Sequence, residues 1–136
     1  MRKDNQKMTI QDINLVYAKL SEVVKEKKVF SGEVNLAIAK NILILEAELK
    51  NFEKSKESLV DKFALKDGEG NPESKNNEYV FASDEDRISY VEAVKELLKA
   101  EVEVEIQKVK YEFLEGEKYD IPAPADLIAM DFMLDY

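Results

Sequence analysis

The chain has 136 residues, of which 45 % are hydrophobic, and its formal net charge at pH 7 is −9. This length and composition predict a single folded domain with a core of its own. Because the chain contains no cysteine and no histidine, disulfides, thiolate chemistry, the usual zinc sites and catalysis by histidine are excluded.

The N-terminal segment contains no apolar stretch as long as a signal peptide requires, so we expect a cytoplasmic protein. A first amphipathic helix is predicted over residues 10–28, where apolar side chains recur at steps of three and four: Ile10, Ile13, Tyr17, Leu20 and Val24. Thr9 and Asp12 resemble a capping box. The lysines of the run 25–28 suit the negative end of the helix dipole. A basic patch that contacts a partner is the alternative interpretation of this run.

The longest regular pattern predicts a helix of roughly 34 residues from Gly32 to Lys66, capped by Ser31. Its apolar row comprises Ile38, Ile42, Leu45, Leu49, Phe52, Leu59 and Phe63. The connection between the two helices is short, which predicts antiparallel neighbours whose apolar rows meet.

Residues 37–45 of this helix are apolar almost all round, apart from Lys40 and Asn41. We therefore expect this part of the helix to be covered from more than one side. The run is too short to span a membrane, which takes about 20 residues.

A helix of this length, about 50 Å, exceeds the diameter of roughly 36 Å expected for a compact domain of this size. We therefore predict a homodimer in which a second copy covers the row around Leu59 and Phe63. The alternative is a helix that bends near residues 54–56 and folds this row back within one chain.

Residues 67–78 are polar and contain two glycines and a proline, which predicts a surface loop. Its acidic and amide residues match several positions of a calcium loop: Asp67, Glu69, Asn71 and Glu78. Pro72 replaces the glycine that such a loop requires, so we predict no calcium site.

Residues 79–81 predict a short strand, and Ser83 caps a predicted third helix over residues 84–100. The inner row of this helix is expected to be Ile88, Val91, Val94 and Leu98.

Apolar and polar residues alternate over residues 102–107, and the apolar ones are β-branched, which favours a strand. This strand and residues 79–81 are expected to pair as a small sheet over the helical hairpin. A helix through the same residues is the alternative.

Pro124 predicts the start of a short closing helix over residues 125–134. Its expected inner row is Leu127, Met130 and Leu134, and further apolar residues exceed the needs of one face: Ile128, Phe132, Met133 and Tyr136. Docking of this excess onto its own domain and an oligomer contact are both open.

The expected fold class is mainly α with a small β element (α+β). It comprises an antiparallel hairpin of long helices, a third helix flanked by short strands, and a short C-terminal helix. The single domain 1–136 is expected to consist of the hairpin (1–66), the surface loop (67–78) and an acidic α+β half (79–136).

Residues 67–136 contain nineteen acidic and seven basic side chains. Binding to nucleic acid through a basic face is therefore unfavourable, whereas an acidic surface suits a partner protein with a basic surface. The alternative is that acidity serves solubility alone. The candidate partner-binding residues are Glu101, Glu103, Glu105, Phe132, Met133 and Tyr136.

No catalytic residue, cofactor site or metal site is predicted. Carboxylate pairs such as Glu46 with Glu53 occur on any helix of so acidic a chain, and a pair of this kind needs a defined cleft to act. The glycines do not form a phosphate-binding loop.

The order of elements resembles that of small, uncharacterised accessory proteins of phages and prophages of Gram-positive bacteria. The residues that carry the resemblance are Ser31-Gly32, Lys66-Asp67-Gly68-Glu69-Gly70-Asn71-Pro72, Tyr79-Val80-Phe81, Glu96-Leu97-Leu98, Glu101-Val102-Glu103-Val104, Ile121-Pro122 and Ala125-Asp126-Leu127. The resemblance implies a viral accessory protein and transfers no site residue.

From the resemblance we expect a non-enzymatic protein that binds and inhibits a host protein, such as a nucleic-acid-guided nuclease of bacterial defence. A virion or assembly component is one alternative. A sponge for a small nucleotide signal is another, for which Arg2 and Arg87 are the only arginines.

Overall fold

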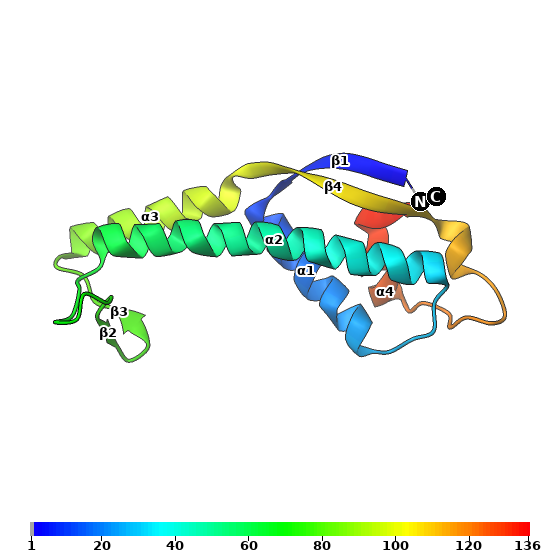
Figure 1. Ribbon diagram of the computed structural model, residues 1–136, viewed down its shortest axis with the longest axis horizontal. Helices are drawn as coiled ribbons and strands as arrows, with labels where there is room; N and C mark the ends of the chain where they lie inside the picture. The colour runs from blue at the N-terminus through cyan, green and yellow to red at the C-terminus, as the bar shows by residue number, and fades with distance from the viewer. Residues whose placement is uncertain (1) are drawn as a thin grey trace. The chain divides into compact units, whose positions relative to one another are not determined.

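The computed structural model describes residues 2–136. The chain is mainly helical with a small β part, which confirms the predicted class, and it forms two compact units (Figure 1). The first unit comprises the chain up to Leu49 together with Glu101–Tyr136, and the second is Lys50–Ala100. The predicted division near residues 66 and 78 is therefore wrong, because most of the predicted acidic half folds with the N-terminal helices.

The sheet of the first unit is built on β4 (Glu101–Lys110), which confirms the predicted strand. Its antiparallel partner is β1 (Arg2–Thr9), and β5 (Leu134–Asp135) pairs with its end in parallel, giving the order β1-β4-β5. The expected pairing of β4 with residues 79–81 is wrong, because β1 takes that place.

The helix α1 (Ile10–Lys25) begins where β1 ends. Thr9 Oγ1 accepts a hydrogen bond from the Asp12 N–H at 3.0 Å, so the predicted cap is confirmed. The helix α2 (Gly32–Phe63) runs without a break, and the predicted alternative of a bend near residues 54–56 is not observed.

The C-terminal segment closes the first unit. A 3₁₀ turn (η1, Tyr111–Leu114) follows β4, and α4 (Pro124–Met130) packs against α1 (Figure 1). The predicted closing helix ends early, because a 3₁₀ turn (η2, Asp131–Met133) leads into β5. Side chains from all these elements form the core, and those fully buried include Ile13, Leu20, Val34, Leu45, Ile106, Val109, Met130 and Met133.

The second unit contains a local hairpin of β2 (Ser74–Lys75) and β3 (Glu78–Tyr79). Asn76 and Asn77 form its turn with φ angles of 54° and 64°, the left-handed backbone that two-residue hairpin turns require. The predicted strand at 79–81 therefore exists in part, and its partner is the preceding loop.

The helix α3 (Asp84–Lys99) is capped by Ser83, whose Oγ accepts the Asp86 N–H at 3.2 Å. Its buried residue is Tyr90, which contacts the rings of two aromatic side chains, Tyr79 and Phe81. The expected inner row is wrong in its first half: Ile88 and Val91 are exposed.

The C-terminal part of α2 lies beside α3. Leu59 of α2 and Leu97 of α3 line one groove, and Leu59 and Phe63 are half-buried. The row around Leu59 and Phe63, which was expected to need a second copy, is thus partly covered by α3 of the same chain. The length of α2 therefore no longer supports the predicted homodimer.

Candidate functional site

The three glutamates predicted to meet a basic partner lie exposed on β4: Glu101, Glu103 and Glu105. The neighbouring strand β1 supplies cations beside them. Lys7 stands opposite Glu103, and Lys3 Nζ lies 3.4 Å from Glu105 Oε1. This pairing lowers the net charge of the strand face and weakens its attraction for a basic partner.

The three apolar candidates at the C-terminal end differ in their exposure. Met133 is fully buried, so its prediction as a partner contact is wrong, and Phe132 is half-buried. Tyr136 is exposed and stacks on Tyr111 with ring centroids 5.7 Å apart. Because β5 joins β4 beyond Glu105, the structure does not gather the six predicted residues into one surface.

In the loop that resembles a calcium site, the first carboxylate accepts hydrogen bonds from backbone N–H groups. Asp67 Oδ1 accepts the N–H groups of Glu69 and Asn71 at 2.9 and 3.0 Å. No group of three or more acidic side chains within residues 2–136 is arranged to hold a metal ion.

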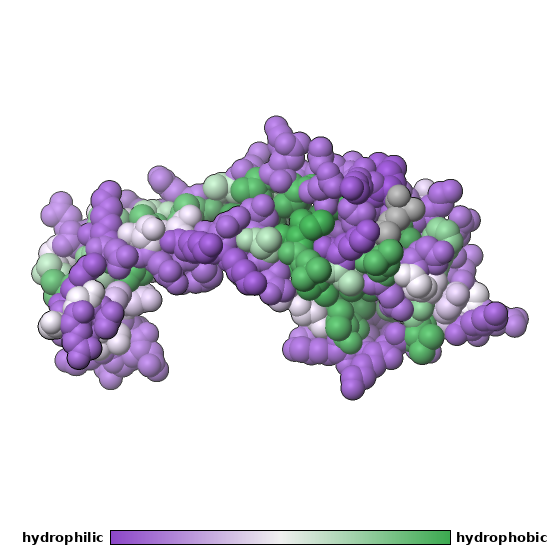
Figure 2. All heavy atoms as spheres, viewed as in Figure 1, coloured by the Kyte–Doolittle hydropathy of each residue, from purple (hydrophilic) through white to green (hydrophobic). Residues whose placement is uncertain are grey.

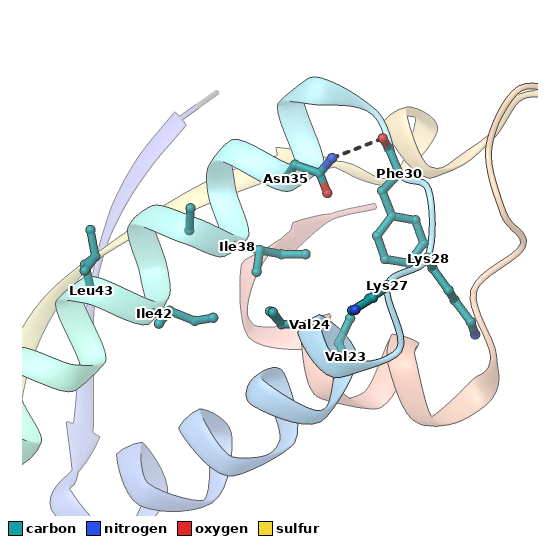
Figure 3. A pocket seen from close by; sticks show the side chains of 10 residues that line it. Val23, Val24, Lys27, Lys28, Phe30, Asn35, Ile38, Ile42 and Leu43 are labelled. Atoms are coloured by element: carbon teal, nitrogen blue, oxygen red, sulfur yellow. Dashed lines mark hydrogen bonds between the residues drawn. The ribbon is translucent and has the colours of Figure 1, made fainter.

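An apolar cleft lies in the first unit between the C-terminal end of α1 and the N-terminal part of α2. Its volume is about 480 Å³. Figure 3 shows Ile38 and Ile42 of α2 facing Val23 and Val24 of α1 across it. The cleft is lined by Val23, Val24, Lys27, Lys28, Phe30, Asn35, Ile38, Ala39, Ile42 and Leu43.

The cleft arises because the two helices separate toward the end of α1 (Figure 1). Val24 continues the buried row of α1, yet it is 50 % exposed. Leu20 and Leu45 of the two predicted rows are fully buried, whereas Val24 is not, so the predicted meeting of the rows does not extend to the end of α1. Hydrophobic atoms gather on this unit in Figure 2.

The exposed side of α2 carries further apolar residues beside the cleft. Leu36 is 47 % exposed and Leu43 is 67 % exposed. With Ala39 they recur at steps of three and four, so they share one side of the helix. The predicted cover from more than one side therefore does not extend to this side of residues 37–45.

Two lysines stand at the mouth of the cleft. Lys28 Nζ lies 2.5 Å from Asp126 Oδ2 and 3.3 Å from Glu26 Oε2. Lys27 forms no ion pair with any residue that the structure describes. The free charge at the mouth is therefore that of Lys27.

The pair of Lys28 with Asp126 ties the end of α1 to α4. The Asp126 side chain is 1 % exposed, and its Oδ2 also accepts the Ala123 N–H at 2.8 Å. Burial alone would raise the pKa of Asp126, but the hydrogen bonds from Lys28 and Ala123 outweigh it and lower the pKa below its ordinary value. The same hydrogen bond raises the pKa of Lys28.

Lys27 has an unusual backbone conformation. Its φ angle is 54°, in the left-handed region where glycine or asparagine commonly ends a helix. A residue with a Cβ is strained there by about 1–2 kcal/mol. This conformation turns the chain out of α1 while Lys27 still lines the cleft.

The cleft offers an apolar surface with a cation at its edge, and none of the described residues that line it carries a carboxylate, hydroxyl or thiol. Small apolar clefts with few polar groups are typical of binding sites. The arrangement is thus suited to holding an apolar group, and the alternative interpretation of the run 25–28 as a partner contact gains a structural setting.

Comparison of the chain with models of protein families, with curated proteins and with solved structures found no significant match. Among residues 2–136, no helix combines the length and the apolar character needed to cross a membrane.

Proposed function

We propose that this protein is a non-enzymatic binding protein that holds an apolar segment of a partner protein in the cleft between α1 and α2. The observation that carries the proposal is the exposure of Val24 and Leu43, 50 % and 67 %, beside the open cleft. Apolar side chains gathered at a concave surface are typical of protein contacts.

The predicted inhibition of a host defence protein is retained as part of this proposal. It rests on the resemblance to phage accessory proteins. Inhibition by binding needs no catalytic group, so the proposal and the resemblance are compatible.

Affinity capture tests the proposal. Tagged wild-type protein, Leu43→Glu and Val24→Glu are incubated with lysate of a Gram-positive bacterium, and retained proteins are quantified by mass spectrometry. We expect a partner that the wild type retains and both variants lose.

Ile121→Glu is the matched control, because Ile121 is 89 % exposed and does not line the cleft. It should retain the partner. A set of retained proteins that is the same for all four proteins would contradict binding through the cleft.

A further inference from the structure

The structure also indicates what kind of segment the cleft accepts, a step that rests on the proposed function. We infer that the occupant is an amphipathic helix whose apolar row is flanked by carboxylates. Two features of the surface support this occupant: the extent of its apolar residues and the charges beside them.

The apolar surface continues past the cleft along α2. Leu36, Ala39 and Leu43 form a row that spans about 10 Å of the helix, or two turns. A small apolar molecule would fill the cleft and leave Leu36 in water. A helix laid along α2, with its axis about 8–10 Å away, would cover this row and enter the cleft at the same time.

Lysines lie at the mouth of the cleft and within the row, although the chain is acidic overall, while two carboxylates of α2, Glu33 and Glu46, lie beyond the two ends of the row. Lys27 lies at the mouth of the cleft, and Lys40 lies between Leu36 and Leu43 on the same side of α2. Neither lysine forms an ion pair within the described part of the chain. Carboxylates on the occupant would complement both lysines, whereas lysines or arginines would be repelled.

A peptide selection tests this inference without knowledge of the natural partner. A displayed library of random 16-residue peptides is selected on the wild-type protein, with counter-selection on Leu43→Glu. We expect enriched peptides with apolar residues at positions i, i+3 or i+4, and i+7, and with Asp or Glu beside that row.

The charge is then tested by titration. An enriched peptide is titrated into the wild type and into Lys27→Glu with Lys40→Glu, and circular dichroism confirms that the variant is folded. We expect the charge reversal to weaken binding roughly tenfold, since exposed charge contacts are individually weak and two of them are reversed. A peptide with its acidic residues changed to lysine should show the opposite preference.

Other results would overturn the inference in distinguishable ways. Enriched peptides with alternating apolar residues would indicate that the occupant is a strand. An equal affinity of the peptide for the wild type and for the variant with both lysines reversed would exclude charge recognition. Binding of laurate with no enrichment of peptides would indicate a small apolar ligand. A dimeric mass that Leu43→Glu halves would identify the occupant as a second copy. In any of these cases, a partner that the wild type captures and that both Leu43→Glu and Val24→Glu lose would leave the proposed function standing.

Discussion

The side-chain amide of Asn41 in α2 hydrogen bonds to both backbone groups of Gln107 in β4. Asn41 Oδ1 accepts the Gln107 N–H at 2.8 Å, and Asn41 Nδ2 donates to the Gln107 carbonyl at 3.0 Å. Asn41 is fully buried. β5 pairs with this edge of β4 only at Val109 and Lys110. At Gln107, the Asn41 amide therefore supplies the hydrogen bonds that a neighbouring strand would otherwise make.

Replacing Asn41 with leucine should destabilise the first unit by about 2–5 kcal/mol. The change leaves a buried N–H and a buried carbonyl of Gln107 without partners, and each costs about 1–3 kcal/mol. Urea unfolding followed by circular dichroism measures the loss. Asn51→Leu, at an exposed position of the same helix, is the control. Equal stability of the two variants would contradict this role of Asn41.

Leu45 and Leu43 form a matched pair on α2. Leu45 is fully buried, so Leu45→Ala should cost about 2–5 kcal/mol through lost contacts and a cavity. Leu43 is 67 % exposed, so Leu43→Ala should cost less than about 0.5 kcal/mol. Denaturant melts of the two variants measure both values. A large loss at Leu43 would mean that the cleft is closed in solution.

The Asp126 carboxyl should make stability depend on acid pH. Its pKa is lowered in the folded protein, so the unfolded chain, with an ordinary aspartate pKa near 4, binds the proton first as the pH falls. The free energy of unfolding therefore decreases as the pH falls from about 4 through the folded-state pKa. Urea unfolding from pH 7 to 3 should show a smaller decrease in Asp126→Asn than in the wild type.

Lys28→Met provides the second arm of that experiment. It leaves the buried Asp126 carboxylate without its cation, so the variant should be less stable than the wild type at pH 7. Protonation of Asp126 removes the unpaired charge, so the difference should shrink toward pH 3. A difference that does not change with pH would show that the hydrogen bond, and not the charge, is what Lys28 supplies.

Lys27→Gly should raise stability while it weakens binding. Glycine adopts the left-handed φ of 54° without strain, which should increase the free energy of unfolding by about 1 kcal/mol. The same change removes the free cation at the cleft. Urea unfolding and peptide titration on one protein sample measure the two effects. A loss of stability would mean that the Lys27 side chain has contacts that support the fold.

Local patterns predicted the elements of this fold well. Thr9 and Ser83 identify helix starts because each side-chain oxygen accepts a hydrogen bond from the backbone N–H three residues later. The alternation around Val104 and Ile106 identified β4 because one of its faces is buried there. These features depend on neighbouring residues only, so the sequence contains them directly.

Pairing between distant segments was not predictable in the same way. The strand β1 has mostly charged and amide side chains, with Met8 as its buried residue, and therefore lacks the usual pattern of a strand. Its backbone hydrogen bonds to β4 decide its conformation. Tyr90 is buried in place of Ile88 because two aromatic rings of the hairpin region meet it.

The sequence does not predict the cleft, because the apolar character of a residue does not determine whether other side chains cover it. Asn41, the polar break in the apolar run, is fully buried, and Leu43, within the same run, is largely exposed. The surplus of apolar residues over residues 37–45 was the available indication. Such a surplus predicts cover from more than one side, whereas the side of α2 that carries Leu43 remains open.

The pairing of β1 with β4 also determines when the protein can fold. The whole second unit separates these strands in the sequence, so a chain emerging from a ribosome exposes β1 long before β4 exists. The second unit is one continuous segment that ends at Ala100, so it can form before β4 is synthesised. Closure of the long loop adds little to the equilibrium cost, about 0.6 kcal/mol for each doubling of its length. It does slow folding, because distant contacts form late. Until β4 is synthesised, the apolar rows of α1 and α2 remain exposed to chaperones, proteases and other nascent chains.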